Sequence, residues 1–287
     1  MEIVRWEQRP QLRQPMLIAA FSGWNDAGEA ATTAARYLAA EWGAKPFATL
    51  DPEEFYDFTS VRPQVRLVDG ITRQIDWPSI EISAAPVPGA GRDAVFLVAP
   101  EPQLRWRTFC ASILGVTSAV GVEMSLTLGA LLTDIPHSRP TRLTGTTTDK
   151  AMAERFGFVA SRYEGPTGIV GALQDAFGRA GVPAASLWAT VPHYVQQVLS
   201  PKAALALVLR AAELVGGRVD PLDLREAGDE YERQVNERLV DDEEATAYVR
   251  TLEEAYDSET RTTVELPLPS ADTLAAEAER FLRDQGD

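Results

Sequence analysis

The hydrophobic positions of this chain form short continuous runs that alternate with amphipathic stretches. Uninterrupted apolar runs are typical of strands that a parallel sheet buries on both faces, and apolar positions three and four residues apart indicate helices. Turn and cap residues such as Ser200-Pro201 mark where helices begin. The predicted strands are 15–21, 47–50, 95–98 and 185–191, and the predicted helices are 30–42, 107–119, 168–178 and 201–214.

Three further segments are predicted from local signals. The runs 65–68 and 71–75 are joined through Asp69-Gly70, a two-residue connection that favours a β-hairpin. Asp149 has the position of an N-cap for a short helix. The apolar segment 126–132 is compatible with either a strand or a short helix.

The alternation of strand and helix predicts an α/β architecture with a mainly parallel mixed sheet. The hairpin adds an antiparallel portion. In such sheets, binding and catalytic sites form in the loops that follow the carboxyl ends of the strands. The loops in question are 22–28, 51–63, 100–106, 134–140 and 192–194.

The net charge of −15 divides the 287 residues into two parts. Residues 220–287 contain 21 Asp and Glu and seven Arg, which gives a net charge of −14. Their apolar positions have the spacing of amphipathic helices, the last of them at 273–282. We therefore expect an α/β domain over 1–219 and an acidic helical C-terminal segment over 220–287, dispensable for folding of the domain. The segment packs on the body or on a neighbouring subunit, or binds a partner of its own. Such a tail repels phosphate groups, which argues against nucleic acid and anionic membranes as partners.

The composition indicates a cytoplasmic protein. No stretch approaches the roughly 18 apolar residues that a membrane helix needs, and the first residues have no signal-peptide pattern. The single cysteine, Cys110, allows no internal disulfide and no multi-cysteine metal site. We expect no metal and no cofactor.

Two glycine-rich turns could bind an anion. Gly23 and Gly28 have the spacing of a phosphate loop, but Glu29 and Ala30 stand where that motif needs Lys and Ser or Thr, so nucleotide hydrolysis is rejected. The dinucleotide-binding fingerprint is absent as well. The segment 165–171 leads into a helix whose free N–H groups could bind a carboxylate or phosphate, although a plain helix cap explains it equally well.

Only two histidines occur, His137 and His193, and each directly follows a proline. Either could be a structural, hydrogen-bonded residue. If both line one cleft with Asp26, Asp51 or Glu101, acid–base chemistry becomes possible. Neither has a neighbour at zinc-ligand spacing.

The candidate cleft collects chemistry-bearing residues from these loops, without an assigned catalytic residue. The same Trp, Tyr and Arg side chains are also typical of subunit interfaces. The candidates are Gly23, Trp24, Asp26, Asp51, Tyr56, Arg62, Glu101, Arg105, His137, Arg139, Gly165, Thr167, Trp188, His193 and Tyr194.

Six blocks carry a family resemblance that spans roughly residues 15 to 257: 21–28, 60–63, 101–106, 134–140, 163–169 and 186–195. Together they resemble the PAC2 family, related to proteasome assembly chaperones, and especially its actinobacterial branch. The resemblance implies a phosphorylase/hydrolase-like three-layer α/β/α sandwich, homo-oligomers with trimers expected, and no established catalytic residues. Some relatives dock on proteasomes through a C-terminal hydrophobic-Tyr-any tripeptide. This sequence ends Gln285-Gly286-Asp287, so the same docking route is not expected.

Two hypotheses follow from the sequence. The first is a non-enzymatic, self-associating assembly chaperone or interaction scaffold with a protein partner related to the proteasome. The alternative is an enzyme or small-molecule binder that takes a nucleoside-like or carboxylate ligand in a strand-end cleft lined by His137, His193, Asp26, Glu101 and Arg139.

Overall fold

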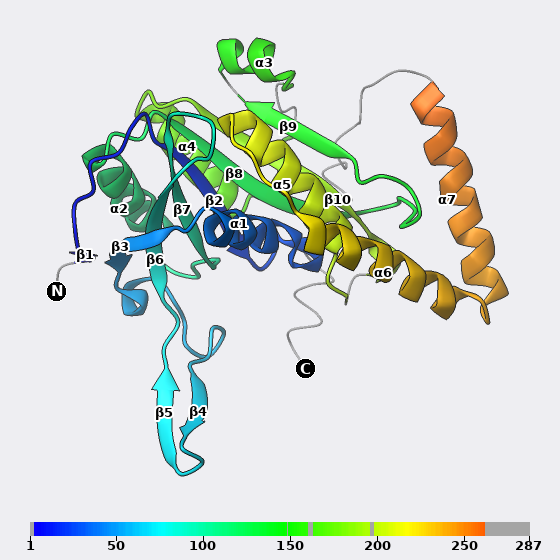
Figure 1. The fold of residues 1–287 in the computed structure, drawn as a ribbon, viewed down its shortest axis with the longest axis horizontal. Helices are drawn as coiled ribbons and strands as arrows, with labels where there is room; N and C mark the ends of the chain where they lie inside the picture. The colour runs from blue at the N-terminus through cyan, green and yellow to red at the C-terminus, as the bar shows by residue number, and fades with distance from the viewer. Residues whose placement is uncertain (1–2, 148, 160–162, 196–197, 262–287) are drawn as a thin grey trace.

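The computed structural model describes residues 3–147, 149–159, 163–195 and 198–261 (Figure 1). The strands are β1 Val4–Trp6, β2 Met16–Ser22, β3 Lys45–Leu50, β4 Gln64–Val68, β5 Thr72–Asp76, β6 Ile80–Pro86, β7 Asp93–Pro100, β8 Met124–Thr133, β9 Leu143–Thr147 and β10 Ala184–Pro192. The α-helices are α1 Ala30–Glu41, α2 Trp106–Ala119, α3 Lys150–Phe156, α4 Ile169–Arg179, α5 Pro201–Val215, α6 Leu222–Leu239 and α7 Glu243–Arg261.

An eight-stranded sheet has the order β1-β3-β6-β7-β2-β8-β10-β9. Its four central strands, β7, β2, β8 and β10, are parallel neighbours. Antiparallel pairing adds β6, β3 and β1 on one side and β9 on the other. Because β3 runs in the same direction as the central four, five of the eight strands share one direction. The mainly parallel mixed sheet is thus confirmed.

Helices cover both faces of the sheet and make three layers. Successive residues of β2 alternate between two hydrophobic clusters: Met16 and Ile18 pack with α1 and α5, whereas Leu17 and Phe21 pack with α2 and α4. Each fully buried side chain of this size stabilises the fold by about 1.5–3 kcal/mol. A strand with helices on both faces has no polar side, which explains its uninterrupted apolar run.

The predicted elements are present, and 126–132 belongs to a strand, β8. Asp149 caps α3 by accepting a hydrogen bond from the Met152 N–H at 2.8 Å. Three strands were not predicted, β1, β6 and β9. They are short, or poor in large apolar residues, as in the Leu-Thr-Gly-Thr-Thr sequence of β9, and pairing with neighbouring strands stabilises them.

The predicted hairpin forms a separate two-stranded sheet. Strands β4 and β5 pair antiparallel over five residue pairs and share no ladder with the main sheet. The hairpin extends well away from the layers of the body (Figure 1).

The acidic segment begins with two long helices, as expected. Helix α6 packs on α5, and its Leu224 belongs to the hydrophobic cluster of α1 and α5. The change of charge near residue 220 therefore coincides with no gap in packing. The division at 219/220 stays a prediction, and 273–282 lies outside the described residues. Among the described helices, none combines the length and apolarity needed to span a membrane.

Candidate functional site

The strand-end loops lie along one edge of the sheet because the central strands are parallel. Glu101 follows β7, Gly23 follows β2, Asp134 follows β8 and His193 follows β10. The side chains nevertheless divide into two groups. We call Gly23, Asn25, Glu101, Gly168 and Ile169 the glutamate cluster, and Asp134, His137, His193, Tyr194 and Asn236 the histidine cluster.

In the glutamate cluster, the carboxylate of Glu101 occupies the start of α4. Its Oε1 accepts hydrogen bonds from the Ile169 N–H at 2.7 Å and from Asn25 Nδ2 at 3.2 Å. Burial raises the pKa of Glu101, while these two donors act in the opposite direction. The glycine-rich entry into α4 thus does bind a carboxylate, and that carboxylate belongs to the chain itself.

Gly168 is required by this close approach. A Cβ at residue 168 would lie 2.1 Å from Asn25 Nδ2 and 2.8 Å from Glu101 Oε1. The backbone of α4 can approach the two side chains only without that atom.

Asp26, a candidate acid or base, caps helix α1. It is 6% exposed, and its carboxylate accepts hydrogen bonds from the Ala31 N–H at 2.7 Å, the Thr32 N–H at 3.2 Å and the Thr32 hydroxyl. Burial raises its pKa, opposed by the Thr32 and Ala31 hydrogen bonds. The carboxylate faces the helix start and contacts neither histidine among the described interactions.

In the histidine cluster, His137 is buried with both ring nitrogens bonded. The Tyr194 hydroxyl accepts the His137 backbone N–H at 2.8 Å and lies 2.7 Å from Nδ1, and Nε2 lies 3.0 Å from Asn236 Oδ1. These bonds are all satisfied if Tyr194 donates to Nδ1 and Nε2–H donates to Asn236. The network is therefore compatible with a neutral imidazole protonated at Nε2.

The surroundings of His137 favour that neutral form. Desolvation lowers the pKa of His137, and the positive charge of Lys202 lowers it further. The hydrogen bond with Asn236 and the negative charges of Glu232 and Glu253 raise this pKa but do not outweigh desolvation. Burial also raises the pKa of Tyr194 to about 12, so its phenol stays protonated.

His193 contacts the ring of the same tyrosine. The centroids of the His137 and His193 rings lie 5.9 and 5.8 Å from that of Tyr194, so the two histidines are neighbours. His193 is half-exposed, with Nδ1 3.0 Å from Asp134 Oδ1, and its ring contacts Tyr248 of α7. The two imidazoles thus contact different helices of the acidic segment, α6 and α7.

Arginines of the loop after β8 hold α7 through charge. Arg139 donates to both carboxylate oxygens of Asp257 at 2.8 and 2.9 Å and to Glu253 at 3.2 Å. These acids raise the pKa of Arg139 above its usual value. The Arg142 guanidinium lies 4.0 Å from the ring centroid of Tyr256 and pairs with Glu259. The bonds of Arg139 fix it against α7, and none of the described hydrogen bonds joins it to Glu101.

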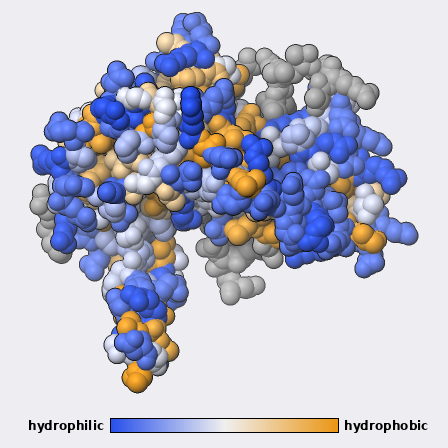
Figure 2. Space-filling view, viewed as in Figure 1, coloured by the Kyte–Doolittle hydropathy of each residue, from blue (hydrophilic) through white to orange (hydrophobic). Residues whose placement is uncertain are grey.

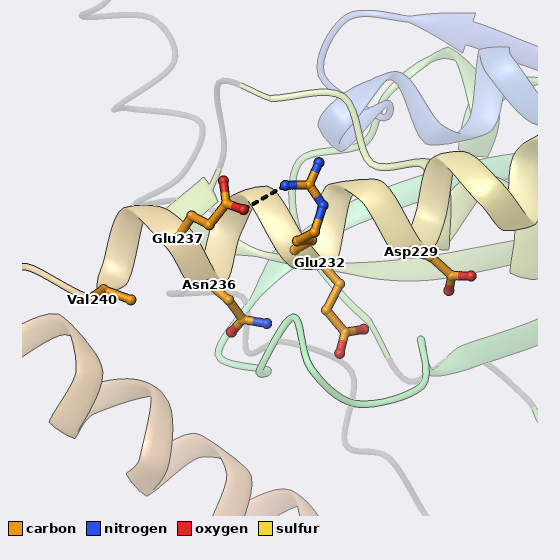
Figure 3. A pocket seen from close by; sticks show the side chains of 6 residues that line it. Asp229, Glu232, Asn236, Glu237 and Val240 are labelled. Atoms are coloured by element: carbon orange, nitrogen blue, oxygen red, sulfur yellow. Dashed lines mark hydrogen bonds and ion pairs between the residues drawn. The ribbon is translucent and has the colours of Figure 1, made fainter.

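A shallow groove of about 450 Å³ lies along α6 on the side of this loop (Figure 3). Three of its six lining residues are acidic, and Arg233 pairs with Glu237 one turn further along the same helix. The groove is lined by Asp229, Glu232, Arg233, Asn236, Glu237 and Val240.

Several candidates have local structural contacts. Asp51 caps the short helix Pro52–Glu54, and the Tyr56 hydroxyl donates to the Pro100 carbonyl at 3.2 Å. Arg105 pairs with Glu54. The Trp188 ring covers Gly129, where a Cβ would lie 2.4 Å from it.

The remaining candidates lie nearer the surface. Three of them are exposed, namely Arg62, Gly165 and Thr167. Trp24, which stands between Gly23 and Asn25 in the sequence, is half-buried.

Sequence reasoning missed several partners of the candidate residues. Asn25 lies inside the first turn and could have been noticed there. Asn236, Lys202 and Asp257 come from distant helices with no motif, so only the fold brings them to the loops. Among the described residues, no group of three His, Cys, Asp or Glu side chains is arranged to hold a metal ion.

Comparison with known proteins gives a consistent picture. The model of the PAC2 family matches residues 20–239, which ends at the last residue of α6. No curated protein matches the chain.

Solved structures provide relatives over most of the chain. A PAC2 family protein from Streptomyces avermitilis is 47% identical, with a TM-score of 0.76, over 82% of this chain and 99% of that one. A proteasome-assembly chaperone homologue from Mycobacterium tuberculosis is 44% identical, with a TM-score of 0.75 and the same coverage. A second Mycobacterium tuberculosis protein, of unknown function, is 26% identical with a TM-score of 0.83, over 99% of this chain and 96% of that one.

Proposed function

The chain belongs to the PAC2 family, and from this membership we propose that it is a non-enzymatic, self-associating assembly chaperone or interaction scaffold. Its partner in this proposal is a proteasome subunit, its place of action is the cytoplasm, and its own assembly is a homo-oligomer, with a trimer expected. The support for the chaperone role comes from the 44% identical relative, which is a homologue of a proteasome-assembly chaperone.

One observation carries the non-enzymatic part of the proposal: the bonded state of His137. A general base needs a free lone pair within hydrogen-bonding reach of a substrate proton. His137 is 2% exposed, and Tyr194 and Asn236 occupy both of its ring nitrogens. Asp26, an acid of the expected cleft, is bonded to the start of α1. The best acid–base candidates thus hold helices in place.

Reconstitution tests the chaperone role. Purified full-length chain is mixed with purified proteasome α and β subunits of the same cell, and the rate of particle assembly is followed by native electrophoresis and peptidase activity. We expect faster assembly than with an equal amount of serum albumin. An unchanged rate, together with no complex in native mass spectrometry, would contradict the proposal.

A second candidate function is favoured by Glu101. Its carboxyl group is largely buried at a strand end, and Oε1 is the oxygen that accepts the hydrogen bonds from Asn25 and Ile169. Its raised pKa suits an acid or a binder of a nucleoside-like or carboxylate ligand. Calorimetric titration with adenosine and with citrate tests this reading. Binding that is lost in Glu101→Gln would favour it, and no heat with either ligand would count against it.

A further inference from the structure

The hairpin β4–β5 has two chemically different faces. Side chains alternate between the faces of a ribbon, so the cross-strand pairs Val65–Ile75 and Leu67–Arg73 lie on one face. The opposite face has Arg66, which pairs with Asp76 at 2.7 Å and with Gln74 at 2.8 Å. Polar groups of the second face are therefore bonded within the hairpin itself.

The first face leaves large apolar side chains in solvent. Three of them lie on this face, Val65 (59% exposed), Leu67 (60%) and Ile75 (51%), whereas Ile71 (87%) lies in the adjoining turn and Trp77 (55%) directly follows β5. Together the five side chains expose on the order of 500 Å² of apolar surface, a size at which a patch marks an interaction site. Figure 2 shows apolar residues on this projecting part, including its tip.

The hairpin makes few packing contacts with the α/β body of the same chain. Its base is held by Trp77, whose ring lies 5.1 Å from that of Phe58. A two-stranded ribbon alone is marginally stable in water and needs packing against another surface. The body elements leave that apolar face uncovered.

We infer that this apolar face packs against the hairpins of the other copies of the chain in the oligomer. This inference rests on the proposed self-association and names its contact surface. The patch supplies more than half of the roughly 800 Å² that each partner buries in a stable interface, and the hairpin backbone and Arg73 can supply the rest.

Two observations favour another hairpin over a different surface of the chain. The other large apolar residues that are exposed in the described chain come from separate elements, as Leu104, Leu209 and Val240 do, whereas those of the hairpin come from one ribbon. The hairpin also extends from a different side of the molecule than α7 (Figure 1). Association through hairpins thus keeps apart the α7 helices of the copies, which are rich in acidic residues and would otherwise repel.

Sedimentation velocity over a range of concentrations tests the inference on the full-length chain. The variant Leu67→Thr/Ile75→Thr keeps β propensity and removes apolar contact area from every copy. We expect it to weaken self-association about 100-fold or more. The matched control is Leu222→Thr, which removes an equally exposed leucine, also 60%, from α6. It should associate like the unaltered chain.

A second variant removes the hairpin altogether. Gln64 and Asp76 are cross-strand partners, so residues 65–75 can be replaced by Asn-Gly without stretching the chain. We expect a folded monomer, judged by circular dichroism. If the unaltered chain is an oligomer and both hairpin variants keep its stoichiometry and affinity, this inference is overturned while self-association stands. If the unaltered chain is a monomer at 100 μM, self-association itself fails.

Discussion

Acidification should destabilise this protein through one histidine, His137. The chain has only two histidines, so a change of stability between pH 7.5 and 5.5 can be assigned with two variants. The folded state binds the neutral imidazole between Tyr194 and Asn236, and desolvation lowers its pKa below the ordinary 6.5. The unfolded chain therefore binds the proton more readily than the folded one.

The sign and size follow from linkage. A histidine whose folded-state pKa is lowered contributes stability that is fully present above the unfolded pKa of 6.5 and is lost as pH falls below it. The slope between the two pKa values is about 1.4 kcal/mol per pH unit. We expect the free energy of unfolding to fall by up to about 1.4 kcal/mol between pH 7.5 and 5.5.

Urea unfolding followed by circular dichroism measures this at fixed protein concentration. His137→Gln should lower stability at pH 7.5 by about 1–3 kcal/mol, because buried partners lose hydrogen bonds, and should remove the pH slope. His193→Gln is the control and should keep the slope. The raised pKa values of Asp26 and Glu101 act with opposite sign but are common to all three proteins. A slope that survives in His137→Gln and vanishes in His193→Gln would refute the assignment.

Three further predictions concern the two clusters and the acidic segment. Gly168→Ala should lower the free energy of unfolding by about 1–3 kcal/mol, because the new Cβ would meet Asn25 and Glu101. Gly178→Ala, inside the helix that Gly168 caps and with open space around it, should be neutral or stabilising, and thermal melts that rank the two variants in reverse would contradict this. Arg139→Gln should loosen α7 and speed hydrogen exchange in 243–259, whereas Arg233→Gln, which breaks pairs within α6, should not. The difference between Arg139→Gln and the unaltered chain should shrink in 0.5 M salt, because salt screens the ion pairs that the unaltered chain still has. Equal exchange in the two variants would count against the ionic attachment. A chain ending at Val240 should keep the body fold with nearly full stability. A chain ending at Val219 should also fold but be several kcal/mol less stable, because it loses Leu224 and Val235 from buried positions. If the chain ending at Val219 is insoluble, α6 completes the core.

The sequence predicted the layers because burial leaves a pattern. A run such as Val95–Val98 is apolar throughout since helices cover both sides of β7, and Asp69-Gly70 specifies a hairpin without help from the rest of the chain. Strands β6 and β9 were missed because their stability comes from neighbouring strands, which single-segment patterns do not report.

The candidate site was predicted only as a set of loops. The sequence indicated that Glu101, His137 and His193 follow strands, and the structure places them on one edge of the sheet. It did not indicate that Glu101 would bond to the start of α4 or that His137 would bond to Asn236, a residue 99 positions away. Such partners are chosen by packing of distant helices, and a neutral polar residue in an acidic helix has no sequence signature.

Native mass spectrometry of the purified full-length chain, alone and mixed with proteasome α subunits of the same cell, tests the central claim most directly. The account predicts a homo-oligomer for the chain alone, with a trimer expected, and a defined complex that contains both chains in the mixture. A monomer that forms no complex with the subunits would contradict it.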